Sequence, residues 1–337
     1  MIGVIMIVVQ VMIGGITRLT ESGLSITEWK PITGALPPLN NADWMVEFEK
    51  YRQTDQFKYV HQDFSLADFK FIFFWEWMHR QWARLLGVVF LAGFVYFLVK
   101  KQFRKNMILP MIILFVLGAL QGLIGWIMVK SGLVPEKYYV GHVELTTHFL
   151  AALGLLAYTQ WFAMSLMPSM KVRLRSAEMK NFLWFILSLL IIQLAYGGFM
   201  AGLKAAQSAP TWPDINGTFI PATIFELKPD ALNFVNNPMM IHFVHRGLAY
   251  LLLVIIFLFF IRSKKAGGST LFKRLSSTLM ILVVIQAVLG IFTVLNGAHP
   301  ERLVWWGVSH QFIAMMMVMC LVALHFITVK HKRGSVN

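Results

Sequence analysis

The chain has 337 residues, of which 57% are hydrophobic, and its mean hydropathy is +0.64. This composition excludes an ordinary soluble domain and predicts an integral membrane protein. The formal net charge of +14 would suit a protein that binds nucleic acid, but the distribution of that charge along the chain argues against this class.

Taken in chain order, eight apolar spans are predicted to be transmembrane helices, since most of them reach the ~20 residues needed to cross a bilayer. The first begins at Met1 with no polar residue before it, so we expect an N-terminal extension to be missing from this chain. A secretory signal peptide is not expected, because there is no charged leading segment and no cleavage site. The spans are residues 1–17, 71–99, 107–129, 143–167, 181–203, 239–261, 275–296 and 304–329.

The loops between these spans fall into two classes by charge. One class holds 16 Lys and Arg residues and a single acid, Glu178, and consists of segments 100–106, 168–180, 262–274 and 330–337. The other holds 11 basic and 13 acidic residues, and consists of segments 18–70, 130–142, 204–238 and 297–303. The positive-inside rule then predicts that both termini are cytoplasmic. Anionic lipids at the inner face account for the basic rim, so no nucleic-acid partner is expected.

Four histidines, His79, His148, His245 and His310, lie near the outer ends of their spans. Between 17 and 21 residues separate each of them from the inner end of its span. At ~1.5 Å of rise per helical residue, all four lie roughly 25–32 Å from the inner face. Four imidazoles at one depth in a membrane predict two bis-histidine metal or haem sites.

The chain also reads as two copies of a four-helix unit, residues 1–167 and 168–337, with long outer loops at 18–70 and 204–238. Each unit has an even number of spans, so the repeat is parallel. We therefore expect an all-α integral membrane protein in which eight transmembrane helices form two parallel-repeat four-helix bundles with both termini inside. The matched residues include Gly14 and Gly197, Ser25 and Ser208, His79-Arg80 and His245-Arg246, Gln121 and Gln286, and His148 and His310.

Each half thus offers two histidines from different helices, which is typical of an axial pair that holds a planar macrocycle. A zinc site would gather three or four ligands. His242 lies one helical turn before His245 and is an alternative ligand. Arg80 and Arg246 are expected to face haem propionates, because a guanidinium suits bidentate contact with a carboxylate. The alternative is that these arginines snorkel to the membrane interface.

The two halves differ in their acidic residues. Glu76 lies three residues before His79 and Glu144 lies four before His148, whereas the second half has His242 and Trp306 at the matching positions. A buried carboxylate beside an iron can accept protons or position water. We therefore expect one half to react and the other to transfer electrons. The alternatives are that Glu76 pairs with Arg80 and that Glu144 lies at the headgroup level.

The other histidines and the single cysteine are expected to be structural. One thiol excludes an internal disulfide and an iron–sulfur site. His325 and Cys320 are expected to be packed within the last span, while loop or tail positions are expected for His61, His142, His299 and His331.

Two sequence motifs resemble those of the haem A synthase family, and the resemblance covers nearly the whole chain. These are E-W-M-H-R at 76–80 and G-G-I-T-R-L-T-E-S-G-L-S-I-T-E-W-K-P at 14–31, together with paired histidines on the second, fourth, sixth and eighth helices. The chain looks most like the alphaproteobacterial and mitochondrial branch. The branch with a cysteine pair in the first outer loop is excluded, because this loop has no cysteine.

The resemblance implies an enzyme that oxidises the C8 methyl group of haem O to a formyl group by two hydroxylations, giving haem A. It implies a resident haem b on His245 and His310, a substrate haem facing His79 and His148, and an essential carboxylate at Glu76. The implied partners are haem O synthase and cytochrome c oxidase, and the implied location is a bacterial inner membrane with the active side facing the periplasm. The electron acceptor, the oxygen source and any homo-oligomer are left open.

Two other classes of protein remain open from the residues alone. One is a di-haem b cytochrome that takes electrons from a quinol without modifying its haem. The other is a transporter built from parallel repeats, although charges at mid-depth, which a transporter would be expected to carry, are absent from these spans.

Overall fold

The computed structural model describes residues 1–28, 30, 33–167, 174, 176–266 and 269–328, and within these ranges the chain is helical and has no strands beyond an isolated bridge between Ile215 and Thr218. The long helices are α1 (Ile2–Leu19), α4 (Leu66–Val99), α5 (Lys105–Gly132), α6 (His142–Ser165), α7 (Ala177–Gly202), α10 (Pro238–Lys265), α11 (Thr270–Leu295) and α12 (Pro300–Thr328). The short helices lie in the outer loops and are α2 (Asn41–Arg52), α3 (Asp55–Tyr59), α8 (Ala205–Ser208) and α9 (Asn233–Asn236).

Seven of these long helices are long and apolar enough to cross a membrane, which makes this an integral membrane protein. The eighth, α6, has 24 residues but a more polar sequence. Two of its polar side chains, Thr146 and Gln160, are buried against other helices, and Gln160 donates to the carbonyl of Met319 at 2.9 Å. Polar groups that face protein do not meet lipid, so they lower the hydropathy of α6 without exposing polar atoms to an apolar solvent.

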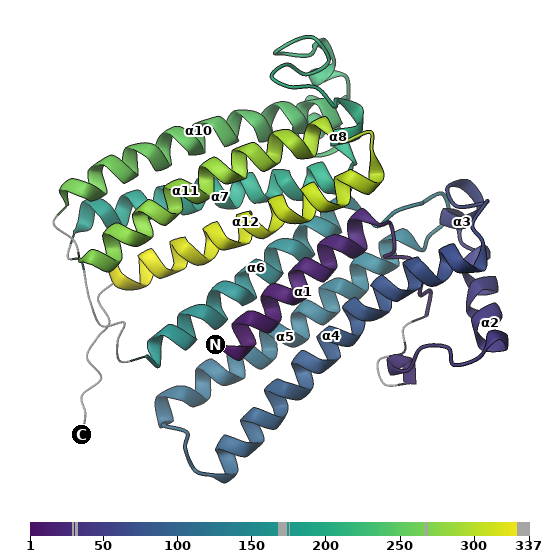
Figure 1. The fold of residues 1–337 in the computed structure, drawn as a ribbon, viewed down its shortest axis with the longest axis horizontal. Helices are drawn as coiled ribbons and strands as arrows, with labels where there is room; N and C mark the ends of the chain where they lie inside the picture. The colour runs from purple at the N-terminus through teal and green to yellow at the C-terminus, as the bar shows by residue number, and fades with distance from the viewer. Residues whose placement is uncertain (29, 31–32, 168–173, 175, 267–268, 329–337) are drawn as a thin grey trace.

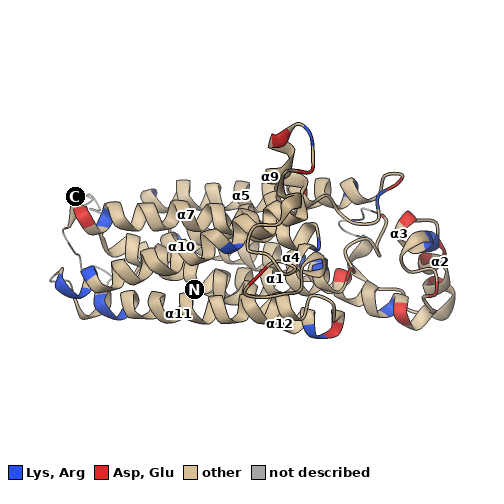
Figure 2. Ribbon diagram, turned by 90° about the horizontal axis from the view of Figure 1, so that it is seen from above, with Lys and Arg blue, Asp and Glu red and all other residues tan. Residues whose placement is uncertain are grey.

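The long helices form two bundles that lie side by side (Figure 1). The first contains α1, α4, α5 and α6, and the second contains α7, α10, α11 and α12. Helices α1 and α6 of the first bundle pack against α12 of the second, and α6 also packs along α7. Lys and Arg gather at the end of the bundles opposite the helices α2 and α3 (Figure 2). This is the charge asymmetry from which the orientation was predicted.

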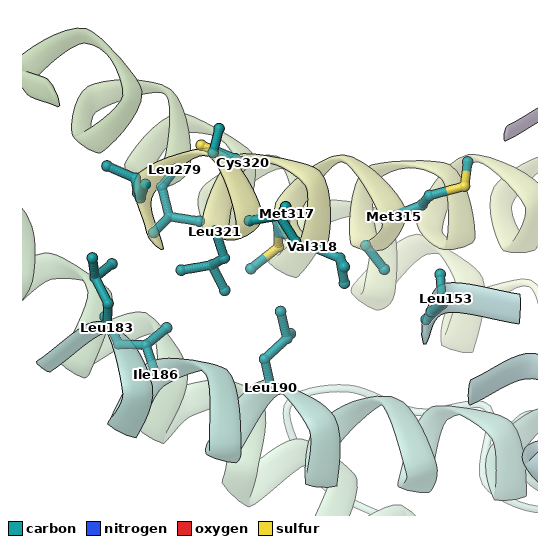
Figure 3. Close-up of a cluster of buried hydrophobic side chains, with 14 of the residues drawn as sticks. Leu153, Leu183, Ile186, Leu190, Leu279, Met315, Met317, Val318, Cys320 and Leu321 are labelled. Atoms are coloured by element: carbon teal, nitrogen blue, oxygen red, sulfur yellow. The ribbon is translucent and has the colours of Figure 1, made fainter. Parts of the chain in front are cut away.

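The apolar core lies mainly in the second bundle and at its contact with the first. Leu183, Ile186 and Leu190 on α7 face Val318 and Leu321 on α12 (Figure 3). Cys320 is buried in this core, as predicted, and its thiol donates to the carbonyl of Leu275 at 3.3 Å. His325 is also buried, with its ring 4.6 Å from that of Trp184, in agreement with a packed residue.

The first outer loop folds into a small core of its own, which the sequence did not predict. Tyr51 and Phe69 are fully buried in it together with Phe48 and Phe57. His61, which was expected to be an ordinary loop residue, is only 8% exposed and lies 2.6 Å from the Tyr51 hydroxyl. This core holds the loop firmly against the outer end of α4.

The two bundles are also joined at their outer ends by residues that are 183 positions apart. The Arg18 guanidinium donates to the carbonyls of Ala201 and Gly202, the latter at 3.3 Å. Glu21 pairs with Lys204, and the His61 ring lies 3.3 Å from the other carboxylate oxygen of Glu21. Residues 18 and 201, and residues 21 and 204, are repeat-matched, so the bundles meet around an approximate two-fold axis.

The Glu21 pair predicts an acid-dependent loss of stability. Burial opposes ionisation of Glu21, but hydrogen bonds from His61 and Lys204 outweigh it and lower its pKa to about 2. A carboxylate with a lowered pKa stabilises the fold above its unfolded pKa, and this contribution is lost as the pH falls from about 4.5 toward 2. We expect Glu21→Gln to lower the free energy of unfolding at pH 7 by ~1–3 kcal/mol and to flatten its dependence on pH below 4.5.

Thermal unfolding of the detergent-solubilised protein between pH 7 and pH 3 measures both effects. Glu49→Gln is the matched control, because Glu49 pairs with Arg52 at an exposed site within the same loop. Equal pH profiles for the wild type and the Glu21 variant would contradict the assignment.

Candidate functional site

Each of the four predicted histidines packs its ring against a glycine of the preceding long helix. A Cβ atom added at Gly14 of α1 would lie 2.9 Å from Cε1 of His79, and one added at Gly125 of α5 would lie 2.8 Å from Cε1 of His148. The corresponding distances are 3.4 Å for Gly197 and His245, and 3.0 Å for Gly290 and His310. The glycines therefore provide the space in which an imidazole lies between two helices.

A glutamine accompanies each of these glycines, one helical turn before it. The amide nitrogen of Gln10 lies 3.2 Å from Nδ1 of His79, and that of Gln121 lies 3.2 Å from Nδ1 of His148. In the second bundle, Gln193 lies 3.5 Å from Nε2 of His245, and Gln286 lies 3.1 Å from Nε2 of His310. All four glutamine Oε1 atoms are buried without a hydrogen-bond partner in the described structure.

These glutamines were only half recognised from the sequence. Gln121 and Gln286 were matched as repeats, but Gln10 and Gln193 were missed. The signal that reveals them is the pattern Gln-x-x-x-Gly, which occurs at 10–14, 121–125, 193–197 and 286–290. A helix with 3.6 residues per turn places both members of this pattern on one face. Each helix hairpin of the fold therefore carries the same three-residue arrangement of Gln, Gly and His.

His245 and His310 face each other across the second bundle. Their ring centroids are 6.5 Å apart and their planes are inclined by 71°. When two imidazoles bind one metal ion through bonds of about 2 Å, their ring centres lie roughly 6 Å apart. The spacing therefore fits a single iron held axially between the rings. The Nδ1 atoms of both rings are buried and lack a partner among the described residues.

The donor set fits haem better than a zinc ion. No group of three or more His, Cys, Asp or Glu side chains in the described ranges is arranged to hold a metal ion. A zinc site needs such a group, whereas a haem iron takes four ligands from its macrocycle and two from the protein. His242, the alternative ligand, is fully buried and accepts a hydrogen bond on Nδ1 from Arg246 at 3.0 Å.

Glu76 links α4 to the first outer loop. Its side chain is buried, and one carboxylate oxygen accepts from the Ser25 hydroxyl at 2.7 Å and from the Ile26 N–H at 2.8 Å. The other oxygen pairs with Arg80 at 2.6 Å. Glu76 is therefore a fully hydrogen-bonded carboxylate one turn from His79, and the pairing with Arg80 considered from the sequence is present. Glu144 lies apart from this network, against Gly141 in the first turn of α6.

Arg80 and Arg246 make equivalent contacts in the two bundles. Arg80 donates to the carbonyls of Ile26 and Glu28 at 3.0 and 3.2 Å. Arg246 donates to the carbonyls of residues 209 and 211, which lie 183 positions further on, at 3.5 and 2.7 Å. Each guanidinium thus fixes the main chain of an outer loop above a histidine. Trp29 and Pro31 of the same segment lie outside the described residues.

The chain is similar to known proteins over nearly its whole length. Residues 1–322 match the family described as cytochrome oxidase assembly protein, COX15-CtaA. A Rhodospirillum centenum protein named Heme A synthase is 40% identical over 96% of this chain and 85% of its own length. Proteins of the same name from Novosphingobium aromaticivorans and Paracoccus denitrificans are each 38% identical over 93% of this chain, and over 89% and 82% of their own lengths. No solved structure is significantly similar. The chain that carries these paired histidines is therefore a member of the COX15-CtaA family of cytochrome oxidase assembly proteins.

Proposed function

We propose that this protein synthesises haem A from haem O by oxidising the C8 methyl group to a formyl group. The observation that carries the proposal is the facing pair His245 and His310, at a spacing that fits a haem iron, in a chain whose relatives are named Heme A synthase. The product would serve cytochrome c oxidase, and the substrate would come from haem O synthase. Mass analysis of the haems extracted after co-expression with haem O synthase tests the reaction, and unchanged haem O would favour a di-haem cytochrome.

In this proposal the second bundle holds a resident haem b and the first receives haem O. His245 and His310 lie between four helices that pack in a closed ring, which suits a permanently bound group. His79 and His148 lie in the bundle that also contains Glu76. A bound haem would supply redox chemistry at iron. The chain itself would hold it with imidazole nitrogens, with an apolar surrounding that excludes water, and with Arg80 and Arg246 near the outer face to meet propionates.

Orientation in the membrane is part of the same proposal. Eight transmembrane helices with both termini inside would place the histidines and the outer loops on the periplasmic side of a bacterial inner membrane. The support is the basic character of the opposite end of the bundles (Figure 2). The outer loops, fixed by Arg80 and Arg246, would then separate the haem edges from bulk water.

We expect replacement of His245 or His310 by Ala to remove most of the resident haem b, because each side chain supplies one axial ligand. The measurement is the pyridine haemochrome content and the low-spin spectrum of the purified variant. His242→Ala is the matched control on the same face of α10. Retention of haem by the His245 variant, with loss in the His310 variant and in the control, would transfer the ligand role of His245 to His242. Retention by both ligand variants would contradict the assignment.

The glutamines beside the resident pair are expected to tune this haem. When a histidine binds iron through Nε2, its Nδ1–H needs an acceptor, and the unpartnered Oε1 atoms of Gln193 and Gln286 would provide one once each imidazole turns so that Nδ1, rather than Nε2, faces the amide. Loss of the acceptor makes the imidazole a weaker donor to ferric iron. Gln193→Leu and Gln286→Leu should therefore raise the midpoint potential of haem b by tens of millivolts.

A redox titration of the purified variants checks this, with Gln160→Leu as the control. Gln160 is also a buried glutamine in a long helix, but it bonds to the carbonyl of Met319. An equal shift of the midpoint potential in all three variants would show that loss of any buried amide changes the potential, and would contradict a specific hydrogen bond to the histidines.

Glu76 is proposed as the carboxylate required for turnover in the substrate half. Methyl oxidation releases protons, and this buried carboxylate lies one turn from His79. Glu76→Gln keeps the shape and removes the charge, so we expect it to retain haem b, accumulate haem O and lower haem A output by at least tenfold. The extracted haems are separated by chromatography, and the amounts of haem b, haem O and haem A are measured by mass spectrometry.

The structural alternative for Glu76 predicts a different outcome. Ser25→Ala removes one donor to the same carboxylate but leaves the charge and the ion pair with Arg80. If the carboxylate acts only as a link to the loop, Glu76→Gln and Ser25→Ala should lower haem A output and thermal stability to similar extents.

A further inference from the structure

The two bundles differ at one seam, between the second and third long helices of each repeat. In the second bundle α10 and α11 pack along one another, whereas in the first α4 and α5 scarcely approach. Phe90 and Phe115 touch across the seam, with ring centroids 6.4 Å apart. Leu85, Val88, Leu120 and Leu123, on the flanking stretches of α4 and α5, are exposed. An apolar seam of this kind opens toward lipid rather than toward water.

A cavity of about 230 Å³ lies where the outer end of this seam meets the first outer loop. Two of its lining residues are directly connected to the candidate substrate site. Arg80 follows His79, and Trp126 follows Gly125, on which the His148 ring rests. The remaining lining residues are Ile26, Thr27, Glu28, Val129, Lys130 and Leu133.

The charges around this cavity leave one cation without an anion. Glu28 is already neutralised by Lys30 and Lys50, at 2.5 and 3.0 Å. Arg80 is bound to Glu76 and to loop carbonyls. Lys130 has its ammonium 5.3 Å from the centre of the Trp126 ring and forms no ion pair with any described residue. A cation beside an apolar opening is an attachment point for an anionic group on an apolar molecule.

This cation is absent from the other repeat. Gln121 and Gly125 match Gln286 and Gly290, and the same offset pairs Lys130 with Leu295 and Trp126 with Ile291. The bundle assigned to a permanent haem therefore has neither the lysine nor the open seam. The bundle assigned to an exchanging haem has both.

We propose that this cavity is a carboxylate subsite at a lateral entrance between α4 and α5, where Lys130 binds a propionate of the porphyrin that enters from the membrane. This rests on the proposed function, which supplies an apolar substrate with two carboxylates. The macrocycle would pass between the two helices toward His79 and His148, while the carboxylate stays at the polar outer end.

The test uses the purified protein with its resident haem in place. Zinc protoporphyrin IX, a fluorescent dicarboxylate that cannot be oxidised to haem A, is titrated against the wild type and against K130M. Removal of a partly exposed ion pair should weaken binding ~5-fold. The dimethyl ester of the same porphyrin should bind equally to both proteins. K137M, which removes an exposed lysine beyond the cavity, is the matched control and should bind the dicarboxylate like the wild type.

Several outcomes would overturn the subsite. One is equal binding of the dicarboxylate by K130M and the wild type. Another is a loss of affinity for the ester in K130M as large as the loss for the dicarboxylate. A third is competition by phosphatidylglycerol as strong as that by the dicarboxylate, which would assign Lys130 to a lipid phosphate. If K130M loses its resident haem, K130R and K130Q replace it. Binding kept by K130R and weakened in K130Q supports the subsite, and any other pattern overturns it. Lysine-dependent binding by a protein that makes no haem A would instead refute the proposed reaction alone.

Discussion

An imidazole ring between two membrane helices occupies space that side chains would otherwise fill, and the fold depends on how this space is provided. At each of four places a glycine faces the ring, and a glutamine one turn away supplies polar contact. In an apolar surrounding an unpaired ring nitrogen is costly, so room without a polar partner would not be enough. Each of the helix pairs α1–α4, α5–α6, α7–α10 and α11–α12 brings one glycine and one glutamine to its histidine ring.

The outer loops depend on the same helices for their position. Arg80 and Arg246 each follow a histidine in the chain and donate to carbonyls of an outer loop. A shift of the helix would therefore move the imidazole ring and the loop together. In the first bundle Glu76 adds a second connection through Ser25 and Ile26. In the second, the neutral His242 occupies the matching position. The buried carboxylate of Glu76 is thus also a structural link to the loop. Its proposed role in turnover and its structural role must therefore be separated by comparing the Glu76 and Ser25 variants.

Much of this arrangement was predictable from the sequence, because hydropathy, loop charge and repeated histidines are direct signals. Gln10 and Gln193 were not recognised, since a single amide in an apolar span gives no periodic signal until its glycine is read with it. The open seam between α4 and α5 was also beyond prediction. Residues that face lipid and residues that face a core are equally apolar, so composition does not distinguish them. The buried role of His61 required the tertiary fold of its loop.

The contact between Glu21 and Lys204 bears on the origin of the chain. A dimer of two identical four-helix units would bring the same residue to both sides of its axis, so that two glutamates or two lysines would repel each other at this place. The opposite charges observed here are compatible only with two halves that have diverged. If either diverged half paired with a copy of itself, two like charges would meet at this place. The ion pair thereby favours one unequal pairing, in which separate tasks for the two proposed haem positions can be inherited together.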